Sequence, residues 1–124
     1  MLVGVLQFEL IIPESRSLKD KRRIVKSVKD KLHREHLVSV AEVEALDQHR
    51  LAVMGLSLVS NSSVYIHSVF DRILHKLSML EGARLGEVMR EVLHGDQLPT
   101  AFETEEGEPL WTEDERRGGA EAGT

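Results

Sequence analysis

The sequence predicts an α+β fold: a four-stranded antiparallel sheet with two helices on one face. Segments with the two-residue period of strands are interleaved with two amphipathic segments of helical period. Their order is strand, helix, strand, strand, helix, strand, which is the split βαβ or ferredoxin-like arrangement. The chain has 124 residues, 41% of them hydrophobic, which supplies enough apolar side chains for the core of one small domain.

Four segments have the composition of strands, and they are expected at residues 2–12, 37–46, 51–59 and 83–93. Pro13 ends the first strand, because proline has no amide hydrogen to donate to a ladder. Four residues separate the second strand from the third, a common length for a hairpin loop. The third strand is apolar on both faces, which suits a central position. The last segment fits a strand or a helical turn by its pattern, and the fold requires a strand there.

Two amphipathic segments, residues 17–34 and 63–80, are expected to form the helices. Ser17 suits the N-cap of the first helix, because its hydroxyl can accept a hydrogen bond from a free backbone amide. Asp20 follows three residues later, at the position of the acid in a capping box and near the positive end of the helix dipole. A run of serine and asparagine precedes the second helix, and Gly82 suits the left-handed position after its end.

The first predicted helix carries a strong charge asymmetry. Residues 16–36 contain nine Lys/Arg and three Asp/Glu, a surplus of six positive charges, whereas the whole chain has a net charge of −5. The cations opposite the apolar stripe that we expect to bind nucleic acid are Lys19, Arg22, Arg23, Lys26 and Arg34. A positive face in an acidic protein is typical of polyanion binding. The alternative is a solvated face whose charges only keep the protein soluble.

Lys21 is an exception, because it lies near the apolar stripe of the same helix. Its aliphatic stem can cover apolar surface while the ammonium group reaches a carboxylate at the rim. Glu42 and Glu44 are two residues apart and are expected on one face of the second strand. We expect a structural ion pair between Lys21 and Glu42. A pair of carboxylates acting as general acid and base is the alternative use of these residues.

Other chemical signatures are missing from the sequence. There is no cysteine, which excludes disulfides, thiolate nucleophiles and Cys-ligated zinc. The six histidines do not have the usual spacing of metal ligands, and no glycine-rich phosphate loop is present. The apolar N-terminus has no preceding positive region, so we do not expect a signal peptide, and no apolar run approaches a membrane span. We therefore expect a cytoplasmic, non-enzymatic protein without metal, cofactor or membrane attachment.

The composition changes near residue 95. Residues 95–124 carry nine Asp/Glu and two Arg among small polar residues. Such a segment has too little apolar surface to offset the entropy of ordering. We therefore expect a domain of residues 1–94 followed by an acidic, disordered tail.

The sheet face away from the helices is the other surface of interest. Val3, Val5 and Ile11 are expected on it, together with alternate residues of the third strand. Many proteins of this fold stack RNA bases on this face with aromatic side chains of the central strands, but this chain has no matching aromatic pair. An apolar face of this kind is rarely left in contact with water. We expect it to be a homodimer interface.

The motif Ser-Leu-Lys-x-Lys-Arg at residues 17–22, followed by Val-Ser-Val-x-Glu at residues 38–42, resembles the YlxP-like family of bacterial proteins of unknown function. The similarity covers about residues 1–94 and implies a ferredoxin-like fold. Members of this family are often encoded beside ribosome-binding factor A and translation factors, which implies a role with the ribosome or RNA. This chain departs from the family pattern at His49 and Arg50, where a Trp-Gln pair is common.

Two functions remain open at this point. The first is a non-enzymatic RNA- or ribosome-associated binding protein that uses its basic helix in ribosome maturation or translation. The alternative is a dimeric small-molecule-sensing or structural interaction module of ferredoxin-like fold, with any ligand site at the dimer interface.

Overall fold

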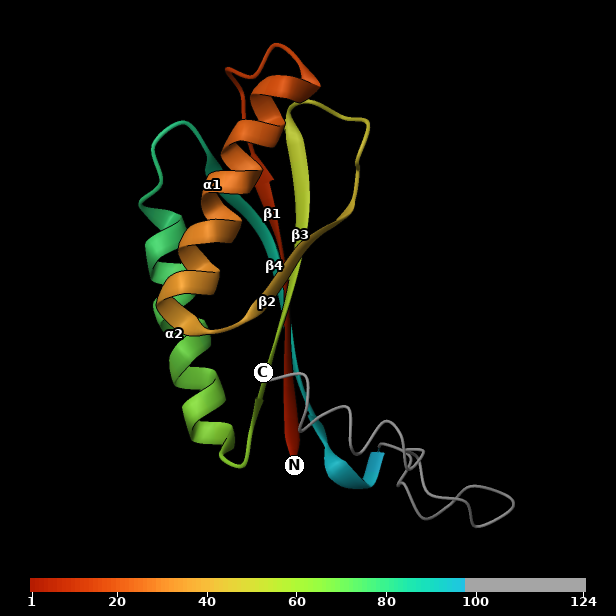
Figure 1. Ribbon diagram of the computed structural model, residues 1–124, viewed down its shortest axis with the longest axis vertical. Coiled ribbons are helices and arrows are strands. Elements are labelled where there is room, and N and C mark those ends of the chain that lie inside the picture. The colour runs from red at the N-terminus through yellow and green to blue at the C-terminus, as the bar shows by residue number, and fades with distance from the viewer. Residues whose placement is uncertain (98–124) are drawn as a thin grey trace, which may run out of the picture.

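A computed structural model describes residues 1–97 of the chain. Its elements are β1 (Leu2–Ile11), α1 (Leu18–His36), β2 (Ser39–Glu44), β3 (Leu51–Ser60), α2 (Ser63–Ser78), β4 (Arg84–His94) and a short 3-10 helix η1 (Gly95–Gln97). The strands form one antiparallel sheet in the order β2-β3-β1-β4. Both helices lie on the same side of it (Figure 1). The predicted ferredoxin-like α+β fold is confirmed.

The element boundaries differ from the predicted ones mainly around β2. The first helix continues two residues past its predicted end, and Leu37 then adopts a left-handed conformation with φ 53°. β2 begins only at Ser39 and stops at Glu44, because Ala45 also takes a positive φ of 57°. The segment assigned to a strand on topological grounds is the long edge strand β4.

The predicted tail begins with residues that have defined structure. Gly95–Gln97 form η1 directly after β4. The other residues assigned to the tail, 98–124, lie outside the described part of the chain.

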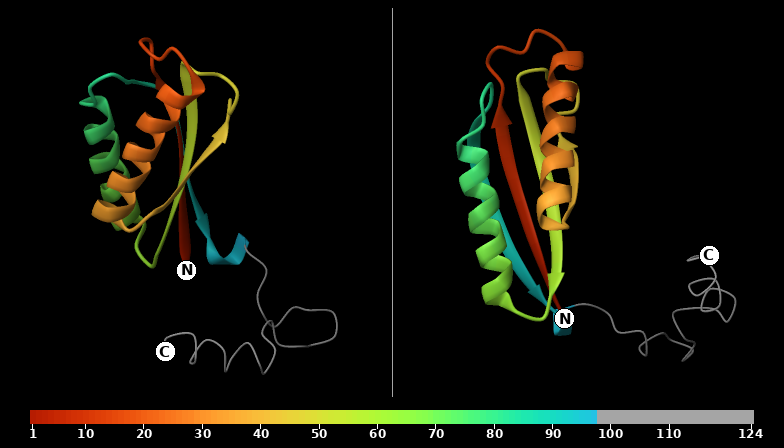
Figure 2. Two further views of the ribbon diagram at one scale, coloured as in Figure 1. Left: turned by 45° about the horizontal axis from the view of Figure 1, so that its top comes forward. Right: turned by 60° about the vertical axis from the view of Figure 1, so that its left-hand side comes forward.

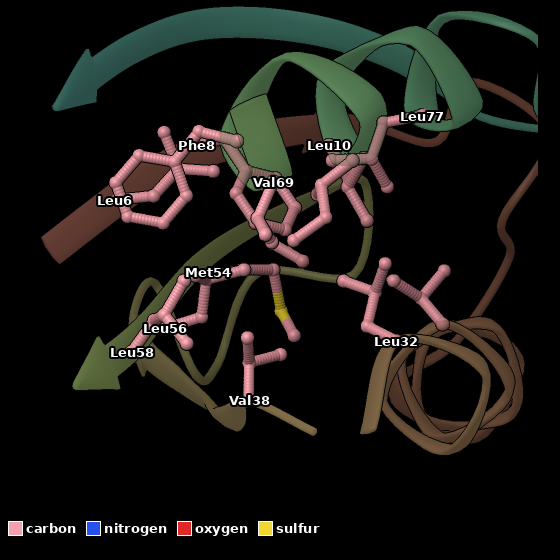
Figure 3. Close-up of a cluster of buried hydrophobic side chains, with 14 of the residues drawn as sticks. Leu6, Phe8, Leu10, Leu32, Val38, Met54, Leu56, Leu58, Val69 and Leu77 are labelled. Atoms are coloured by element: carbon pink, nitrogen blue, oxygen red, sulfur yellow. The ribbon is translucent and has the colours of Figure 1, made fainter. Parts of the chain in front are cut away.

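The hydrophobic core lies between the sheet and the helices (Figure 3). The central strands β1 and β3 supply alternate side chains to it, and the helices supply residues at intervals of three and four. Its largest fully buried apolar side chains are Phe8, Phe70, Leu6, Leu10, Ile12, Leu32, Met54, Ile66, Ile73, Leu77 and Val38. This packing fixes which face of each helix remains in solvent.

Gly4 allows α2 to approach β1 closely. A β-carbon at this position would lie 2.4 Å from Cγ2 of Ile66 and 2.8 Å from Cζ of Phe70. Any larger residue would therefore displace the side chains of Ile66 and Phe70, which pack α2 against the sheet.

The opposite face of the sheet, here called the open face, carries no helix within residues 1–97 (Figure 2). Its exposed apolar side chains are Val5 on β1, Val43 next to Gly55 of β3, Val59 on β3 and Met89 on β4. No helix in the described part of the chain is both long and apolar enough to cross a membrane.

Candidate nucleic-acid interface

The helix α1 is fixed at both ends by local hydrogen bonds. The Ser17 side chain caps its start by accepting a 3.1 Å hydrogen bond from the amide of Asp20. The Asp20 carboxylate in turn accepts a 2.9 Å hydrogen bond from the amide of Arg16. At the other end the amide of Leu37 donates to the carbonyl of His33 at 3.1 Å. These contacts satisfy backbone groups that a helix end leaves free, so the cations between them sit on a defined scaffold.

One stripe of α1 is buried against the sheet, and this burial directs the side chains on the other faces of the helix toward solvent. Lys21, Val25, Val28 and Leu32 face the sheet and are buried. The five side chains predicted to bind nucleic acid lie away from this stripe and are all exposed; we call Lys19, Arg22, Arg23, Lys26 and Arg34 the basic face. From first to last it spans about 22 Å along the helix axis, at 1.5 Å per residue.

Ion pairing occupies only part of the basic face. Lys26 donates a hydrogen bond to Asp30 with an Nζ–Oδ2 distance of 2.8 Å, and both side chains are exposed. This hydrogen bond raises the pKa of Lys26 and lowers the pKa of Asp30. Among residues 1–97, no carboxylate lies within ion-pairing distance of Lys19, Arg22, Arg23 or Arg34. These four cations can bind an external anion without first breaking a contact.

A shallow hollow follows the middle of the same helix. Arg23, Lys26 and Arg34 line it together with Ser27, Lys31 and Asp30. The hollow therefore places several cations around a single carboxylate. Such a surface favours anions, and the arginines add planar guanidinium groups that can bind a phosphate through two hydrogen bonds.

Lys21 is paired with Glu42, as expected, but the ammonium group is buried and does not lie at the rim, while the Glu42 side chain is 15% exposed. The Lys21 side chain is 1% exposed and its ammonium lies 2.7 Å from Oε2 of Glu42. It donates hydrogen bonds to the carbonyls of Ala45, Leu46 and Leu51 at 2.9, 3.2 and 3.3 Å. These carbonyls use its three N–H groups, so the Glu42 oxygen has a close ionic contact and no directed hydrogen bond. The ammonium thereby links α1 to the β2–β3 loop.

The expectation that Glu42 and Glu44 share a face is wrong. The register of β2 against β3 shifts between them, so that Glu42 pairs with Met54 and Glu44 with Val53. Met54 and Val53 are adjacent in β3 and point to opposite faces. Glu42 therefore faces α1, Glu44 faces the open side, and the two carboxylates cannot form the acid–base pair that the sequence left possible.

The shifted Glu44 joins an acidic hollow that the sequence did not reveal. Glu9, Glu44 and Glu87 line it at one end of the open face, next to Val53 and Met89. Glu9 accepts a 3.0 Å hydrogen bond from the amide of Glu87, where β4 shifts register against β1. Within residues 1–97 no group of three or more His, Asp or Glu residues is arranged to hold a metal ion.

The end of α1 is joined to α2 by a polar cluster. Lys76 on α2 donates to the Glu35 carboxylate at 2.6 Å and lies 3.0 Å from Nε2 of His36. Burial, followed by the positive charge of Lys76, lowers the pKa of His36. The cluster therefore favours a neutral imidazole.

Comparison with known proteins supports the resemblance noted from the sequence. A family model described as a protein of unknown function, DUF503, matches residues 3–90. The uncharacterized protein YlxP of Bacillus subtilis (strain 168) is 29% identical over 73 residues, which cover 59% of this chain and 79% of that protein. The family match includes all of α1 and the β2–β3 hairpin. Neither description names an activity.

Proposed function

The chain belongs to the DUF503 family of proteins of unknown function, and we propose that it acts as a non-enzymatic, ribosome-associated RNA-binding protein. One observation carries the proposal: four cations on the basic face have no carboxylate partner within residues 1–97, in a chain whose net charge is −5. The genomic association with ribosome and translation factors that the YlxP-like resemblance implies favours RNA over other polyanions.

Binding through this face would depend on the phosphate backbone. Lysine and arginine side chains that neutralise phosphates release counterions, which gives affinity without reading the base sequence. Arg22, Arg23 and Arg34 would supply the directional contacts, because a guanidinium matches the geometry of two phosphate oxygens. The open face would contribute little stacking, because Phe8, the aromatic residue of β1, is fully buried on the helix side.

The proposal is tested by co-sedimentation of the full chain with ribosomes. The double variant Arg22→Glu, Arg23→Glu reverses two charges at the N-terminal end of the basic face, and we expect it to lose most of the co-sedimenting protein. Arg72→Glu, Arg84→Glu is the matched control, because both arginines are exposed, lie outside α1 and give the same change in net charge. Equal loss in both variants, or retention in both, would contradict a role for the basic face.

A second candidate concerns the open face. We propose that it pairs with a second copy of the chain, as in a dimeric sensing or interaction module. The supporting observation is the exposure of Val5, Val43, Val59 and Met89, which are 37%, 46%, 62% and 64% accessible. Aliphatic side chains on a face without a helix suit a symmetric contact between two copies. Any ligand site of such a module would lie at this contact.

A further inference from the structure

The basic face has a candidate partner within the same chain. Residues 98–124 contain eight Asp/Glu and two Arg, a net charge of −6, which equals in size the surplus of six positive charges in residues 16–36. Seven of the acidic residues lie in two groups, at 103–108 and 113–115. Their number exceeds that of the four cations of the basic face that have no ion pair within residues 1–97.

The starting point of residues 98–124 puts both acidic groups within reach of α1. η1 lies beside the N-terminus, since a β-carbon on Gly95 would be 3.1 Å from the carbonyl oxygen of Met1. The helix α1 runs from the opposite end of the sheet toward this end (Figure 2). Counted from Gln97, an extended chain reaches about 20 Å by Glu103 and about 60 Å by Glu115, whereas α1 is about 28 Å long.

We propose that the acidic segment 103–115 docks on the basic face of α1 in the same molecule and competes there with RNA phosphates. The docking does not require the proposed RNA-binding function, whereas the competition rests on it. Carboxylates can make the same paired hydrogen bonds to arginine that phosphates make. The contact between Lys26 and Asp30 already shows a carboxylate held on this face.

Because the acidic segment is covalently attached to the domain, even a weak contact with the basic face can compete with RNA. A segment on a short linker has an effective concentration on the order of 1 mM, so a docking Kd of about 0.1 mM would lower the apparent affinity for RNA about tenfold. The contact joins exposed charges, so salt should weaken it as the screening length falls from about 10 Å at 0.1 M to about 3 Å at 1 M.

Docking is measured by carbodiimide crosslinking of the full chain, followed by peptide mass spectrometry. This reagent joins carboxylates and amines that touch. We expect links from 103–115 to Lys19 and Lys26 at low salt, and their loss in about 1 M salt. The pair Lys76–Glu35, at 2.6 Å, should link without help from the acidic segment and serves as positive control. The Met1 amine is left out of the comparison, because it lies where the segment begins.

Each crosslinking result either supports or overturns the proposed docking. Links from 103–115 to Lys19 or Lys26 within one molecule support it, and a mixture of isotope-labelled and unlabelled protein identifies links between molecules. Links confined to lysines outside the basic face (Lys29, Lys31 or Lys76), links only between molecules, or no links from this segment overturn it.

Competition is measured by fluorescence anisotropy with labelled poly(U) RNA. Replacing Glu103, Glu105, Glu106 and Glu108 by Gln keeps the length of the chain and should tighten binding about tenfold at about 0.1 M salt. The control replaces four exposed glutamates elsewhere, Glu44, Glu81, Glu87 and Glu91, and should change binding less than about twofold. Equal effects of the two sets would overturn the competition.

The failure of this inference and the failure of the proposed function give different results. If no variant binds RNA, the proposed function and the competition both fail, while the crosslinks still decide the docking. If RNA binds equally well to the natural protein and to both glutamate-to-glutamine variants, and the α1 lysines form no links, the docking fails and the proposed function stands.

Discussion

At the scale of single residues, Lys21 and Lys26 show that two cations of one helix can have different roles, one in the interior and one on the surface. Lys21 is buried and holds three carbonyls and one carboxylate, whereas Lys26 is exposed and pairs with Asp30. The sequence predicted the partner of Lys21 from its position next to the apolar stripe. It did not predict the burial, because two of the three accepting carbonyls, those of Ala45 and Leu46, come from a loop that is shaped by the left-handed conformation of Ala45.

Removing the buried cation should destabilise the protein strongly. We expect Lys21→Met to lower the free energy of unfolding by about 3–5 kcal/mol, because Glu42 loses its counterion and three carbonyls lose a donor. Glu42→Gln should cost less, because the same carbonyls still hold the ammonium. Urea denaturation measures both. A loss below about 1 kcal/mol for Lys21→Met would mean that the ammonium is not buried as described.

Asp30 should weaken RNA binding, because it is a carboxylate in the middle of the basic face. Asp30→Asn releases Lys26 for phosphate contact, so affinity should rise and the slope of log K against log salt should steepen by about 0.7 for single-stranded RNA. Asp71→Asn is the control, since it breaks the exposed pair with Arg90 and changes the net charge equally. A similar gain from both variants, measured by anisotropy, would indicate a general charge effect.

At the scale of elements, patterns in the sequence located both helices and the first three strands but not the irregularities between them. The cap at Ser17 and the apolar stripe of α1 follow directly from residue types and spacing. The register shift in β2 does not, because a bulge depends on how two strands pair. That shift sends Glu44 to the open face and separates it from Glu42. The acidic hollow beside it was missed for the same reason, since β1, β2 and β4 each supply one of its carboxylates.

The polar cluster of Glu35, His36 and Lys76, which connects the end of α1 to α2, should make the free energy of unfolding depend on pH. The pKa of His36 is lowered from 6.5, so the folded state binds fewer protons than the unfolded state near this pH. The contribution of the neutral imidazole to the free energy of unfolding is present above about pH 6.5. It is lost as the pH falls through the lowered pKa of His36. His36→Gln should therefore reduce the difference in unfolding free energy between pH 8 and pH 5.5.

The control for this pH dependence is His75→Gln, a substitution at an exposed histidine in the last turn of α2. Urea denaturation at both pH values measures the two variants and the natural protein. If His36→Gln keeps the full pH dependence, the cluster of Glu35, His36 and Lys76 does not favour a neutral histidine.

At the scale of the whole molecule, the order of elements was enough to predict the fold. Residues 83–93 alone fitted a strand or a helical turn, and only the need for a fourth strand assigned them to β4. The orientation of the basic face could also be predicted, since a helix with a clear apolar stripe has one outer side. The sequence could not predict that four of these cations lack an ion pair within residues 1–97, because ion pairing depends on which carboxylates the fold brings near α1.

The open face should set the oligomeric state. We expect the natural protein to be a dimer in sedimentation equilibrium, and Val59→Glu, Met89→Glu to make it monomeric, because charged side chains would be buried at the contact. Val64→Glu, Met79→Glu is the matched control, because these residues are 78% and 69% exposed but lie on and just after α2. A natural protein that sediments as a monomer would contradict the dimer.

The central claim is that the basic face of α1 binds RNA through phosphates, and the salt dependence of binding to single-stranded RNA tests it most directly. If about four phosphates are neutralised, log K should fall against log salt with a slope of about −3 for the natural protein, and removing two contacts should bring the slope to about −1.5. We predict that result for Arg22→Glu, Arg23→Glu and an unchanged slope for Arg72→Glu, Arg84→Glu. Equal slopes for all three proteins would contradict the claim.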